Sequence, residues 1–375
     1  MAAIVIVNGI GDTVVAFRGA LVRDLVERGH AVTVSTPHPE EVSSHSVAEA
    51  VAALGARCVF SPLERTGLSP RSEWRTRQHY CELFDELRPD AVFVSNPKPI
   101  FHAVSAACAV GVARRVAMVT GLGYAFTGGS FKARVLRSVA VQLYRRALGD
   151  ATHVYFQNQD DCDELARLGA LAHAPTPRFI AGSGVDLAAF AAAPPAQGPP
   201  LFLMIARLLS EKGVREFAEA AHIVRKKRPS WRFRLVGWID RNPAAIRREE
   251  LTEWVQRGTV EYAGRCDDVR DELRSAHVFV LPSYREGTPK SVLEAMAMAR
   301  PVITTDTVGC RETIRNGVEG LLIAPRNVAA LVDACLQLGD DPARCVEFGV
   351  AARRRAEERF DVRIVNAEIM EALGA

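Results

Sequence analysis

The sequence has little excess charge of either sign. Its 47 lysines and arginines exceed its 44 aspartates and glutamates by only three. A chain this close to neutral lacks the strongly basic character of nucleic-acid-binding domains, so we expect no nucleic-acid partner. Local basic patches remain compatible with this balance.

Cysteine motifs and long apolar runs are also missing. The eight cysteines are scattered, with no C-x-x-C pair and no metal-like cluster, which is typical of reduced thiols in a cytosolic protein. The opening MAAIVIVNGIGD has no basic region, so it predicts a buried strand rather than a signal peptide. The longest apolar stretch, near Ala103–Ala113, is about half the roughly 20 residues that a membrane span needs. We therefore expect a cytoplasmic protein that crosses no membrane, although it can still lie on the inner face of the plasma membrane.

Short runs rich in Val, Ile and Phe alternate with longer helical patterns along the chain. Continuous apolar runs flanked by helices indicate strands buried on both faces, as in the parallel sheet of an α/β architecture. In the first half, these runs are Ile4–Val7, Ala31–Ser35, Ala91–Ser95, Val116–Thr120 and His153–Gln157. In the second half, they are Leu201–Ala206, Arg232–Gly237, Val278–Pro282, Pro301–Thr305 and Gly320–Pro325.

A segment rich in Ala, Pro and Gly, Ala188–Pro200, separates the two series of strands. Its composition is typical of a linker, and 375 residues are too many for one ordinary core. We expect two doubly wound, Rossmann-like α/β domains that face a cleft, with ligands at the carboxyl ends of the strands. The expected division is an N-terminal domain over 1–190, a linker over 191–200 and a C-terminal domain over 201–360. The last helix, within 361–375, can pack back on the first domain.

Two glutamates, Glu286 and Glu294, stand on either side of a Thr-Pro step in REGTPKSVLE. Thr288 is the expected N-cap of a helix and Pro289 suits its first position, so Glu286 lies in the preceding loop. A helix N-terminus at the carboxyl end of a strand favours a phosphate, whereas a carboxylate accepts hydrogen bonds from neighbouring sugar hydroxyls. The pattern indicates a sugar nucleotide with one glutamate on each side of its diphosphate. The plain alternative is that these acids compensate the helix dipole.

A second pattern places two cations at the end of another strand. In LFLMIARLLSEKG, Arg207 follows the strand directly and Lys212 comes five residues later. Two cations at this position can neutralise a diphosphate leaving group, although surface charge at the start of a helix explains them equally well. Because both segments lie in the same half of the chain, each at a strand end, their joint occurrence favours a common site.

Together, the Arg207–Lys212 segment and the Glu-x7-Glu pattern of EGTPKSVLE resemble family 4 glycosyltransferases of the two-domain GT-B type. The resemblance covers essentially the whole chain and is strongest over Leu201–Pro325. Within that family, the segments TGLGYAF, VLPSYREGTPKSVLEAMAM and TTDTVGCRETI look most similar to bacterial enzymes that extend polyprenyl-diphosphate-linked sugars, including N-acetylgalactosaminyltransferases and enzymes of capsular glycan assembly.

The resemblance implies a role for each matching residue. Arg207 and Lys212 hold the donor diphosphate, Glu286 contacts the transferred sugar, and Glu294 binds the nucleotide ribose. Further positions that match the donor-binding region are Gly9, Gly11, Gly237, Arg265, Thr288, Lys290 and Ser291. The glycines at 9 and 11 suit a loop that lets backbone approach the donor, or an ordinary tight turn.

One departure from the family concerns Thr120. Many members carry a histidine at the end of the strand that here reads VAMVT, and this histidine contacts the donor sugar. The chain has Thr120 there, followed by GLG, so that contact is not predicted. The TGLG variant itself resembles the subgroup that acts on lipid-linked sugars.

The family also implies a reaction. It transfers a hexose or N-acetylhexosamine from a nucleotide diphosphate, with uridine the expected base, retains the anomeric configuration and uses neither a metal nor a cofactor. Hydrolysis by the two glutamates is disfavoured, because a glycosidase needs two carboxyls facing one bond across about 5–9.5 Å. A sugar-nucleotide epimerase, a transferase acting on a soluble natural-product acceptor and a non-catalytic nucleotide-sugar-binding subunit remain alternatives.

The prediction of an acceptor-binding site depends on the segment Phe131–Leu148, which contains five cationic residues and no acidic one. Its cations are Lys132, Arg134, Arg137, Arg145 and Arg146, and Phe131, Val135, Val139 and Leu143 form one apolar stripe. Such a helix can lie on an anionic membrane surface or receive a lipid diphosphate, or its stripe can pack on the sheet. Arg18 and Lys98, near predicted strand ends, are further candidates for the phosphate of a polyprenyl-diphosphate-linked glycan acceptor, or ordinary surface charges.

Overall fold

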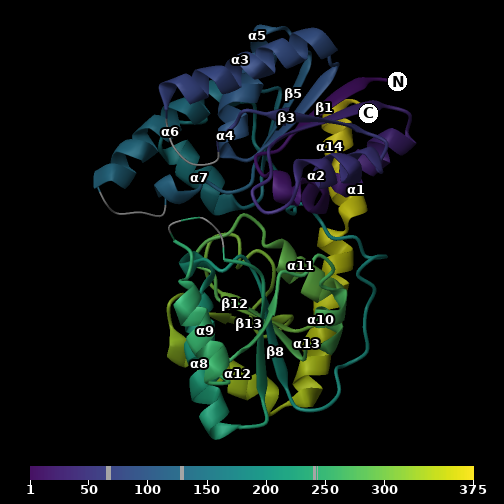
Figure 1. The fold of residues 1–375 in the computed structure, drawn as a ribbon. Helices are drawn as coiled ribbons and strands as arrows, with labels where there is room; N and C mark the ends of the chain where they lie inside the picture. The colour runs from purple at the N-terminus through teal and green to yellow at the C-terminus, as the bar shows by residue number, and fades with distance from the viewer. Residues whose placement is uncertain (65–68, 127–130, 240–241, 243) are drawn as a thin grey trace. The chain divides into compact units, whose positions relative to one another are not determined.

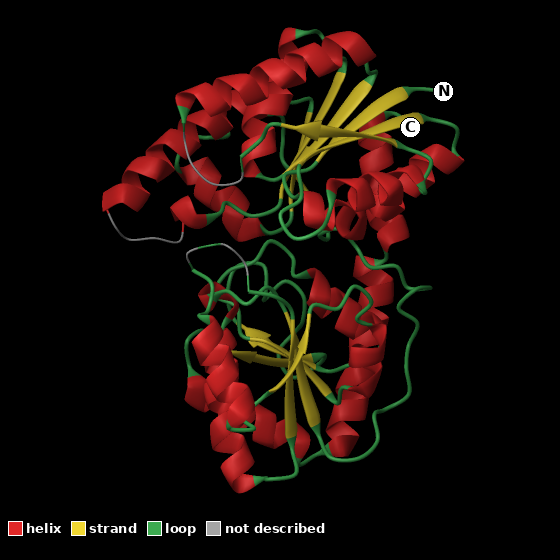
Figure 2. Ribbon diagram, in the orientation of Figure 1, coloured by secondary structure: helices red, strands yellow, loops and turns green. Residues whose placement is uncertain are grey.

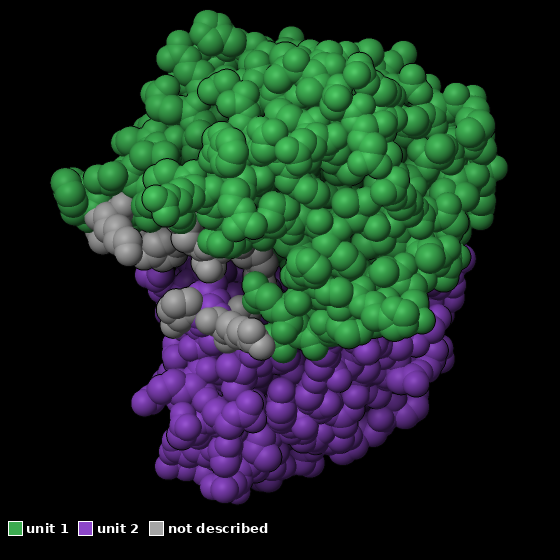
Figure 3. Space-filling view, turned by 45° about the horizontal axis from the view of Figure 1, so that its top comes forward, with its two compact units in different colours: residues 1–183, 363–375 green, residues 184–362 purple. Residues whose placement is uncertain are grey.

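The computed structural model describes residues 1–64, 69–126, 131–239, 242 and 244–375, without the side chains of Tyr124 and Lys132. The chain forms two compact units, shown in different colours in Figure 3. Unit 1 comprises 1–183 with 363–375, and unit 2 comprises 184–362. Each unit is built on one parallel sheet with helices around it, which confirms the expected doubly wound α/β fold class (Figures 1 and 2).

The sheet of unit 1 has the strand order β3-β2-β1-β4-β5-β6-β7, and every pair is parallel. Its strands are β1 (Ala3–Val7), β2 (Ala31–Pro37), β3 (Arg57–Ser61), β4 (Ala91–Ser95), β5 (Arg114–Val119), β6 (His153–Phe156) and β7 (Arg178–Phe179). The chain runs outward from β1 to β3 and then crosses back to β4. The boundary between β1 and β4 is therefore the switch point of the sheet, where open α/β sheets bind ligands.

The helices of unit 1 cover both faces of this sheet, because right-handed crossovers change face when the chain changes direction. One core lies under α1 (Val14–Glu27), α2 (Ser44–Ala52) and α14 (Val362–Leu373). The other lies under α3 (Pro70–Leu87), α5 (Ser105–Ala109), α6 (Phe131–Gly149) and α7 (Gln159–Arg167). Short turns complete the unit: η1 (Gly11–Thr13), α4 (Pro97–Pro99), η2 (Ile100–Val104) and η3 (Tyr124–Phe126).

The C-terminal helix α14 is built into unit 1. Its residues Val365 and Ile369 are buried in the same core as α1 and α2. The Asn366 amide donates to the Asp24 carboxylate on α1 at 2.7 Å, and Asn366 is itself buried. A paired amide at this depth fixes the register of α14 against α1, because a shift would leave buried polar groups without partners.

Unit 2 contains a second parallel sheet, with the order β10-β9-β8-β11-β12-β13. Its strands are β8 (Leu201–Ile205), β9 (Arg232–Val236), β10 (Glu261–Gly264), β11 (Val278–Leu281), β12 (Val302–Thr305) and β13 (Gly320–Ile323). Its helices are η4 (Ser210–Lys212), α8 (Val214–Lys227), α9 (Arg248–Gln256), α10 (Arg270–Ser275), α11 (Lys290–Ala297), α12 (Val328–Gly339), α13 (Pro342–Arg355) and η5 (Ala356–Phe360). The neighbours β8 and β11 carry the two segments singled out in the sequence.

The segment expected to be a linker is attached to unit 2. Unit 1 ends at Ser183, ahead of the expected boundary at 190. Arg300, which is 2% exposed, donates from Nη2 to the carbonyl oxygens of Ala193 at 2.9 Å and Pro194 at 2.6 Å. Its other nitrogens donate to the carbonyls of Met298 and Ala276 at 3.1 Å. One buried guanidinium therefore holds this segment against the domain.

Replacement of Arg300 should test this attachment. We expect Arg300→Met to lower the free energy of unfolding of unit 2 by about 2–4 kcal/mol, because four carbonyl groups lose a charged donor. Urea unfolding can be followed by tryptophan fluorescence, since Trp231, Trp238 and Trp254 all lie in unit 2. The matched control is Arg228→Met, which removes an exposed pair with Asp340 and should change stability little. Equal losses in both variants would contradict a special role for Arg300.

Candidate active site

The loops after β8 and β11 bring Lys212 and Glu286 together. Lys212 Nζ lies 2.6 Å from Oε1 and 2.7 Å from Oε2 of Glu286. Both side chains are largely buried, with 15% and 12% of their surfaces exposed. The two residues are 74 positions apart in sequence, and they meet because β8 and β11 are adjacent parallel strands that end at the same edge.

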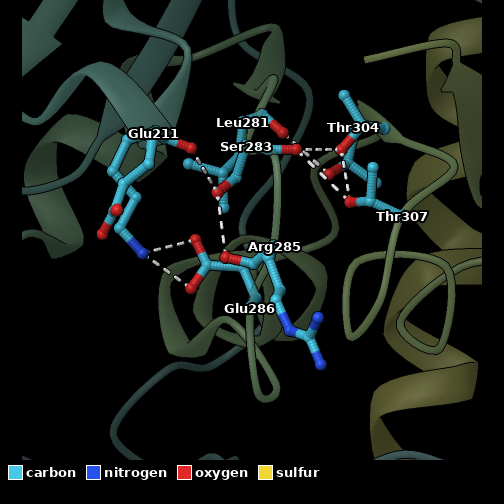
Figure 4. A network of polar contacts seen from close by, with 9 residues as sticks. Glu211, Leu281, Ser283, Arg285, Glu286, Thr304 and Thr307 are labelled. Carbon is cyan, nitrogen blue, oxygen red and sulfur yellow. Dashed lines mark hydrogen bonds and ion pairs between the residues drawn. The ribbon is translucent and has the colours of Figure 1, made fainter. Parts of the chain in front are cut away.

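Buried hydroxyl groups hold the two loops in register (Figure 4). Ser283 Oγ donates to the carbonyl oxygen of Glu211 at 3.1 Å and lies 3.5 Å from that of Arg285. The Tyr284 backbone N–H donates to the same Glu211 carbonyl at 2.8 Å. Ser283 thus joins the Lys212 loop to the Glu286 loop. It lies in the segment VLPSYREGTPKSVLEAMAM that carries part of the family resemblance, although the sequence alone assigns it no role.

A third strand supports this arrangement from the neighbouring position in the sheet. Thr305 and Thr307, at the end of β12, direct their hydroxyls to the Ser283 carbonyl, the second over 3.3 Å (Figure 4). Thr304 donates to the carbonyl of Leu281 at 2.7 Å. The threonines occur in the segment TTDTVGC that carries part of the family resemblance, although the sequence alone assigns them no role.

Glycines allow the close approach of these backbones. Gly309 has φ +77°, and a Cβ there would lie 2.1 Å from the Gly287 oxygen and 2.3 Å from the Glu286 oxygen. Gly213, with φ +75°, would bring a Cβ within 2.2 Å of the Pro282 oxygen. Both positions therefore require glycine on conformational and steric grounds. Gly309 packs the turn after β12 against the loop that holds Glu286.

The helix α11 starts one residue later than expected. The sequence predicts Thr288 as the N-cap and Pro289 as the first helical residue, but the helix begins at Lys290 with Pro289 at the N-cap position. Proline has no side-chain acceptor, so the N-cap residue itself supplies no side-chain hydrogen bond to the first turn. Thr288, Lys290 and Ser291 are partly buried at this end of the helix.

Glu294 lies one turn inside α11, on the side that is largely removed from water. Its carboxylate lies 3.7 Å from Lys290 Nζ, and 12% of its side chain is exposed. Burial raises the pKa of Glu294, although the charge and hydrogen bond of Lys290 act in the opposite direction. A carboxylate kept in this position costs stability, which favours a binding role over compensation of the helix dipole.

Three other predicted donor positions lie around the same sheet edge. Arg207 follows β8 and is partly buried. Gly237 follows β9 with φ +147°, and a Cβ there would lie 1.8 Å from the Ala206 oxygen, so the glycine lets the two strand ends meet. Arg265 lies beyond the edge strand β10, with its guanidinium 5.1 Å from the Trp238 ring centre and its Nε 3.2 Å from Asp267 Oδ1. The described contacts of Arg265 do not include Lys212 or Glu286.

In unit 1, the glycine loop after β1 lies at the switch point of the sheet. The Gly9 N–H donates to Asn96 Oδ1 at 3.0 Å, and Asn96 Nδ2 donates to Thr120 Oγ1 at 3.0 Å. Thr120, which stands where many family members carry histidine, therefore belongs to a chain of polar contacts across β1, β4 and β5. A Cβ at Gly11 would lie 2.5 Å from the Pro37 oxygen, so the backbone of Gly11 packs closely against the end of β2 in the same unit.

Arg18 is a core residue rather than a surface charge. It is 3% exposed, its guanidinium carbon lies 5.1 Å from the Phe93 ring centre, and Nη1 donates to Ser183 Oγ at 3.3 Å. Burial lowers the pKa of Arg18 to about 10. These interior contacts favour a structural role over the expected contact with acceptor phosphate.

Lys98 follows β4 and is engaged by neighbouring groups. Its Nζ donates to the Glu64 carbonyl and to Glu73 Oε1, both at 2.8 Å, and His102 Nε2 lies 2.6 Å from Glu73 Oε2. Burial raises the pKa of Glu73, but hydrogen bonds from His102 and Lys98 outweigh it and leave this pKa below its usual value. Lys98 is thus part of a fixed cluster at the carboxyl end of β4.

The helix α6 presents the predicted basic face. Arg137 donates from Nε to the Ala125 carbonyl at 3.1 Å, and Arg134 lies over the Phe131 ring at 5.9 Å. The side chain of Lys132 lies outside the described part of the structure.

Among the described residues, no group of three His, Cys, Asp or Glu side chains is placed to hold a metal ion.

Two family models match the chain, one in each unit. Residues 13–175 match a glycosyl transferase 4-like domain, and residues 199–341 match glycosyl transferases group 1. The chain therefore belongs to the glycosyltransferases of the two-domain GT-B type and is an enzyme that transfers sugar, as the sequence motifs predicted.

Curated relatives agree with this assignment. The chain is 28% identical over 344 residues to an N,N'-diacetylbacillosaminyl-diphospho-undecaprenol alpha-1,3-N-acetylgalactosaminyltransferase of Campylobacter jejuni, with 88% of each chain covered. It is 33% identical to a glycogen synthase of Mycobacterium tuberculosis over 48% of this chain and 44% of that protein. It is also 33% identical to the putative glycosyltransferase EpsD of Bacillus subtilis over 43% of this chain and 42% of that protein.

Solved structures share the fold at low identity. Sucrose-phosphate synthase from Thermosynechococcus elongatus has a TM-score of 0.79 and 18% identity, covering 99% of this chain and 98% of that one. Anabaena Alr3699/HepE in complex with UDP-glucose also has a TM-score of 0.79, at 17% identity with both chains covered completely.

No described helix of the present chain combines the length and apolar character required to span a membrane.

The hydroxyl of Ser283 provides a test of the loop network. We expect Ser283→Ala to lower kcat/KM for sugar transfer about tenfold, because the Lys212 and Glu286 loops lose a buried hydrogen bond that aligns them. The control, Ser275→Ala, removes an exposed hydroxyl that also donates to a carbonyl, that of Glu272 at 2.8 Å. A stability loss with unchanged kcat/KM would show that Ser283 serves folding alone.

The raised pKa of Glu294 predicts an unusual dependence of stability on pH. A carboxyl with a raised pKa holds its proton more tightly in the folded state, so its contribution to stability is present at low pH and is lost as pH rises through the folded pKa. We therefore expect Glu294→Gln to be more stable than the wild type at pH 8, with a difference that shrinks toward pH 4. Urea unfolding at several pH values measures this, with the exposed Glu253→Gln as control. A variant less stable at pH 8 would contradict it.

Proposed function

We propose that the enzyme transfers a hexose or N-acetylhexosamine from a UDP-sugar to a saccharide carried on a polyprenyl diphosphate, with retention of anomeric configuration. The observation that carries this proposal is the pairing of Lys212 with Glu286 at adjacent strand ends, beside the start of α11. A cation for the diphosphate and a carboxylate for the sugar lie side by side there, as a nucleotide-sugar donor requires.

In the proposed donor site, the charged groups bind different parts of the nucleotide sugar. Arg207 and Lys212 stabilise the negative charge that builds up on the leaving diphosphate. Backbone N–H groups at the start of α11, within Thr288–Ser291, add to the attraction for phosphate. Glu286 accepts hydrogen bonds from hydroxyls of the transferred sugar, and Glu294 accepts those of the ribose. In this proposal the cations take the charge-neutralising role, so neither a metal nor a cofactor is required.

The relatives support the identity of donor and acceptor. The Campylobacter protein, by its name, transfers N-acetylgalactosamine to a diphospho-undecaprenol-linked sugar, and it matches this chain over most of its length. The Anabaena structure contains UDP-glucose on the same fold. By this analogy we assign the enzyme to the assembly of bacterial surface glycans or glycoprotein glycans, on the cytoplasmic side of the membrane where nucleotide sugars are available.

A donor screen tests the proposal. Nucleotide sugars are titrated by calorimetry with and without EDTA, and released nucleotide is measured with a short-chain polyprenyl-diphosphate-linked saccharide or the free saccharide as acceptor. We expect one UDP-sugar to bind equally well with EDTA and to react with the lipid-linked acceptor. Lys212→Ala should lower kcat about 10²–10³-fold, and Glu294→Ala should weaken donor binding about 10–100-fold.

The control variants are Lys226→Ala and Glu253→Ala, which remove exposed charges on α8 and α9. Both should behave as the wild type. If no nucleotide sugar binds, or if Lys212→Ala and Glu294→Ala match the controls, the assignment of the donor site is wrong. Transfer to the free saccharide with equal kcat/KM would instead replace the lipid-linked acceptor with a soluble one.

A further inference from the structure

Asn96, the residue that follows β4, has a backbone conformation that only glycine adopts freely. Its φ is +76° and its ψ is 150°. Arg88, which precedes β4, also has a positive φ, but its φ of 46° and ψ of 53° lie close to the ordinary left-handed region in which many helices end. The conformation of Asn96 lies outside that region and is strained in any residue that has a Cβ. Such strain persists only where other contacts hold it, and it is concentrated at functional sites.

The side-chain amide of Asn96 connects three neighbouring strands at the switch point of unit 1. The Gly9 N–H, after β1, donates to Asn96 Oδ1 at 3.0 Å, and Asn96 Nδ2 donates to Thr120 Oγ1, after β5, at 3.0 Å. Gly9 also packs directly on this turn, because a Cβ there would lie 3.2 Å from Asn96 Cβ and 3.1 Å from Pro99 Cγ. Asn96 therefore holds both the loop after β1 and the end of β5.

These two hydrogen bonds determine the direction of the Thr120 hydroxyl. A backbone N–H can only donate, so the amide oxygen must face Gly9 and the amide nitrogen must face Thr120. The amide nitrogen can likewise only donate, so Thr120 Oγ1 accepts and keeps its own proton for another partner. Thr120 is partly exposed, and among the described residues the structure shows no acceptor for that proton.

A purely structural role does not account for asparagine at position 96. Glycine would adopt the same φ and ψ without strain. Asn96 and Thr120 are both partly exposed, so water could satisfy the Thr120 hydroxyl if the amide were absent. What the amide adds is a fixed direction for a hydroxyl donor at the edge of the sheet where open α/β sheets bind ligands.

We propose that Asn96 is a positioning residue for sugar transfer, and that it acts by directing the Thr120 hydroxyl to donate a hydrogen bond to a saccharide hydroxyl. A donor that is already oriented loses less freedom when the ligand binds. The inference rests on the proposed function for its substrates and deepens it, because it assigns a saccharide contact to this edge of unit 1. The saccharide hydroxyl belongs either to the transferred sugar or to the acceptor, and kinetics separate these two sources.

Replacement of Asn96 by aspartate tests the direction of the Thr120 hydroxyl. The carboxylate has nearly the same shape and still accepts from the Gly9 N–H, but it has no N–H to donate, so Thr120 must donate to it instead. We expect Asn96→Asp to melt close to the wild type and to lower kcat/KM for sugar transfer about tenfold.

Variants of Thr120 provide the comparison. Thr120→Val should lower kcat/KM to a similar extent, whereas Thr120→Ser keeps the hydroxyl and should retain most of the activity. The control is Thr252→Val, which removes an exposed hydroxyl on α9 that donates to the Arg248 carbonyl at 2.9 Å. This control should have the kcat/KM of the wild type.

A double-mutant cycle shows whether Asn96 acts through Thr120. If it does, Asn96→Asp should cause little further loss in the Thr120→Val background, because the hydroxyl that it turns away is already absent. Losses that multiply would mean that the new negative charge acts on the substrates directly, and the inference would fail. A higher KM for the donor, with slower donor hydrolysis in the absence of acceptor, identifies the transferred sugar as the ligand. A higher KM for the acceptor alone identifies the acceptor saccharide.

Thermal melts test the strain separately from catalysis. Asn96→Gly loses the amide but relieves the backbone, whereas Asn96→Ala loses the amide and stays strained, so the glycine variant should melt about 3 °C or more above the alanine variant. Both should still lower kcat/KM. Arg88→Gly is the matched control, because it relieves a positive φ at the opposite end of β4 and should keep wild-type activity.

Failure of the inference is distinct from failure of the proposed function. A wild type that turns over no UDP-sugar refutes the proposed function. An active wild type whose Asn96→Asp variant has an equal kcat/KM, or an Asn96→Ala variant that melts as high as Asn96→Gly, overturns the inference about Asn96 and leaves the proposed function intact.

Discussion

Burial of both faces of two parallel sheets is the constraint on which the rest of this enzyme depends. Strands such as β4 and β11 are buried along their whole length, because helices cover the sheet on each side. Polar chemistry is consequently confined to the loops at the strand ends. Since all strands in a parallel sheet end at the same edge, residues as distant in sequence as Lys212 and Glu286 come together there without any local signal that they should.

The pairing of Lys212 with Glu286 explains the buried polar network behind it. An ion pair that is largely removed from water is stable only while its two charges stay close together. A charge that moves away from its partner there is poorly solvated. The hydroxyl of Ser283 and those of Thr305 and Thr307 provide this geometry through backbone carbonyls. Gly309 lets the turn after β12 approach closely enough to support the loop. Contacts within the chain thus hold Lys212 and Glu286 in a fixed geometry, which is the condition under which charges would contribute to catalysis in the proposed donor site.

Much of the fold was predictable, and the failures have physical causes. The buried strands were found from their apolar runs, but β3, β7 and β10 were not, because they are edge strands with exposed or partly exposed residues. The composition of Ala188–Pro200 predicts a linker, yet Arg300, a hundred residues away, attaches it to unit 2. Arg18 looks like a surface charge in the sequence, and only the packing around Phe93 and Ser183 reveals that it is buried.

The sequence by itself determined the class of fold, the family and the residue types available for binding a sugar nucleotide, because periodicity, turn composition and short motifs are local properties. The tertiary structure decided which of these residues meet. It joined Lys212 to Glu286, placed Glu294 where burial raises its pKa, and put Ser283 between two loops. It also decided which face of α6 is buried, since a stripe of Phe131, Val135 and Val139 looks the same in sequence whether it packs on a sheet or lies in water. That choice depends on neighbours distant in sequence, and burial is a property of the folded chain alone.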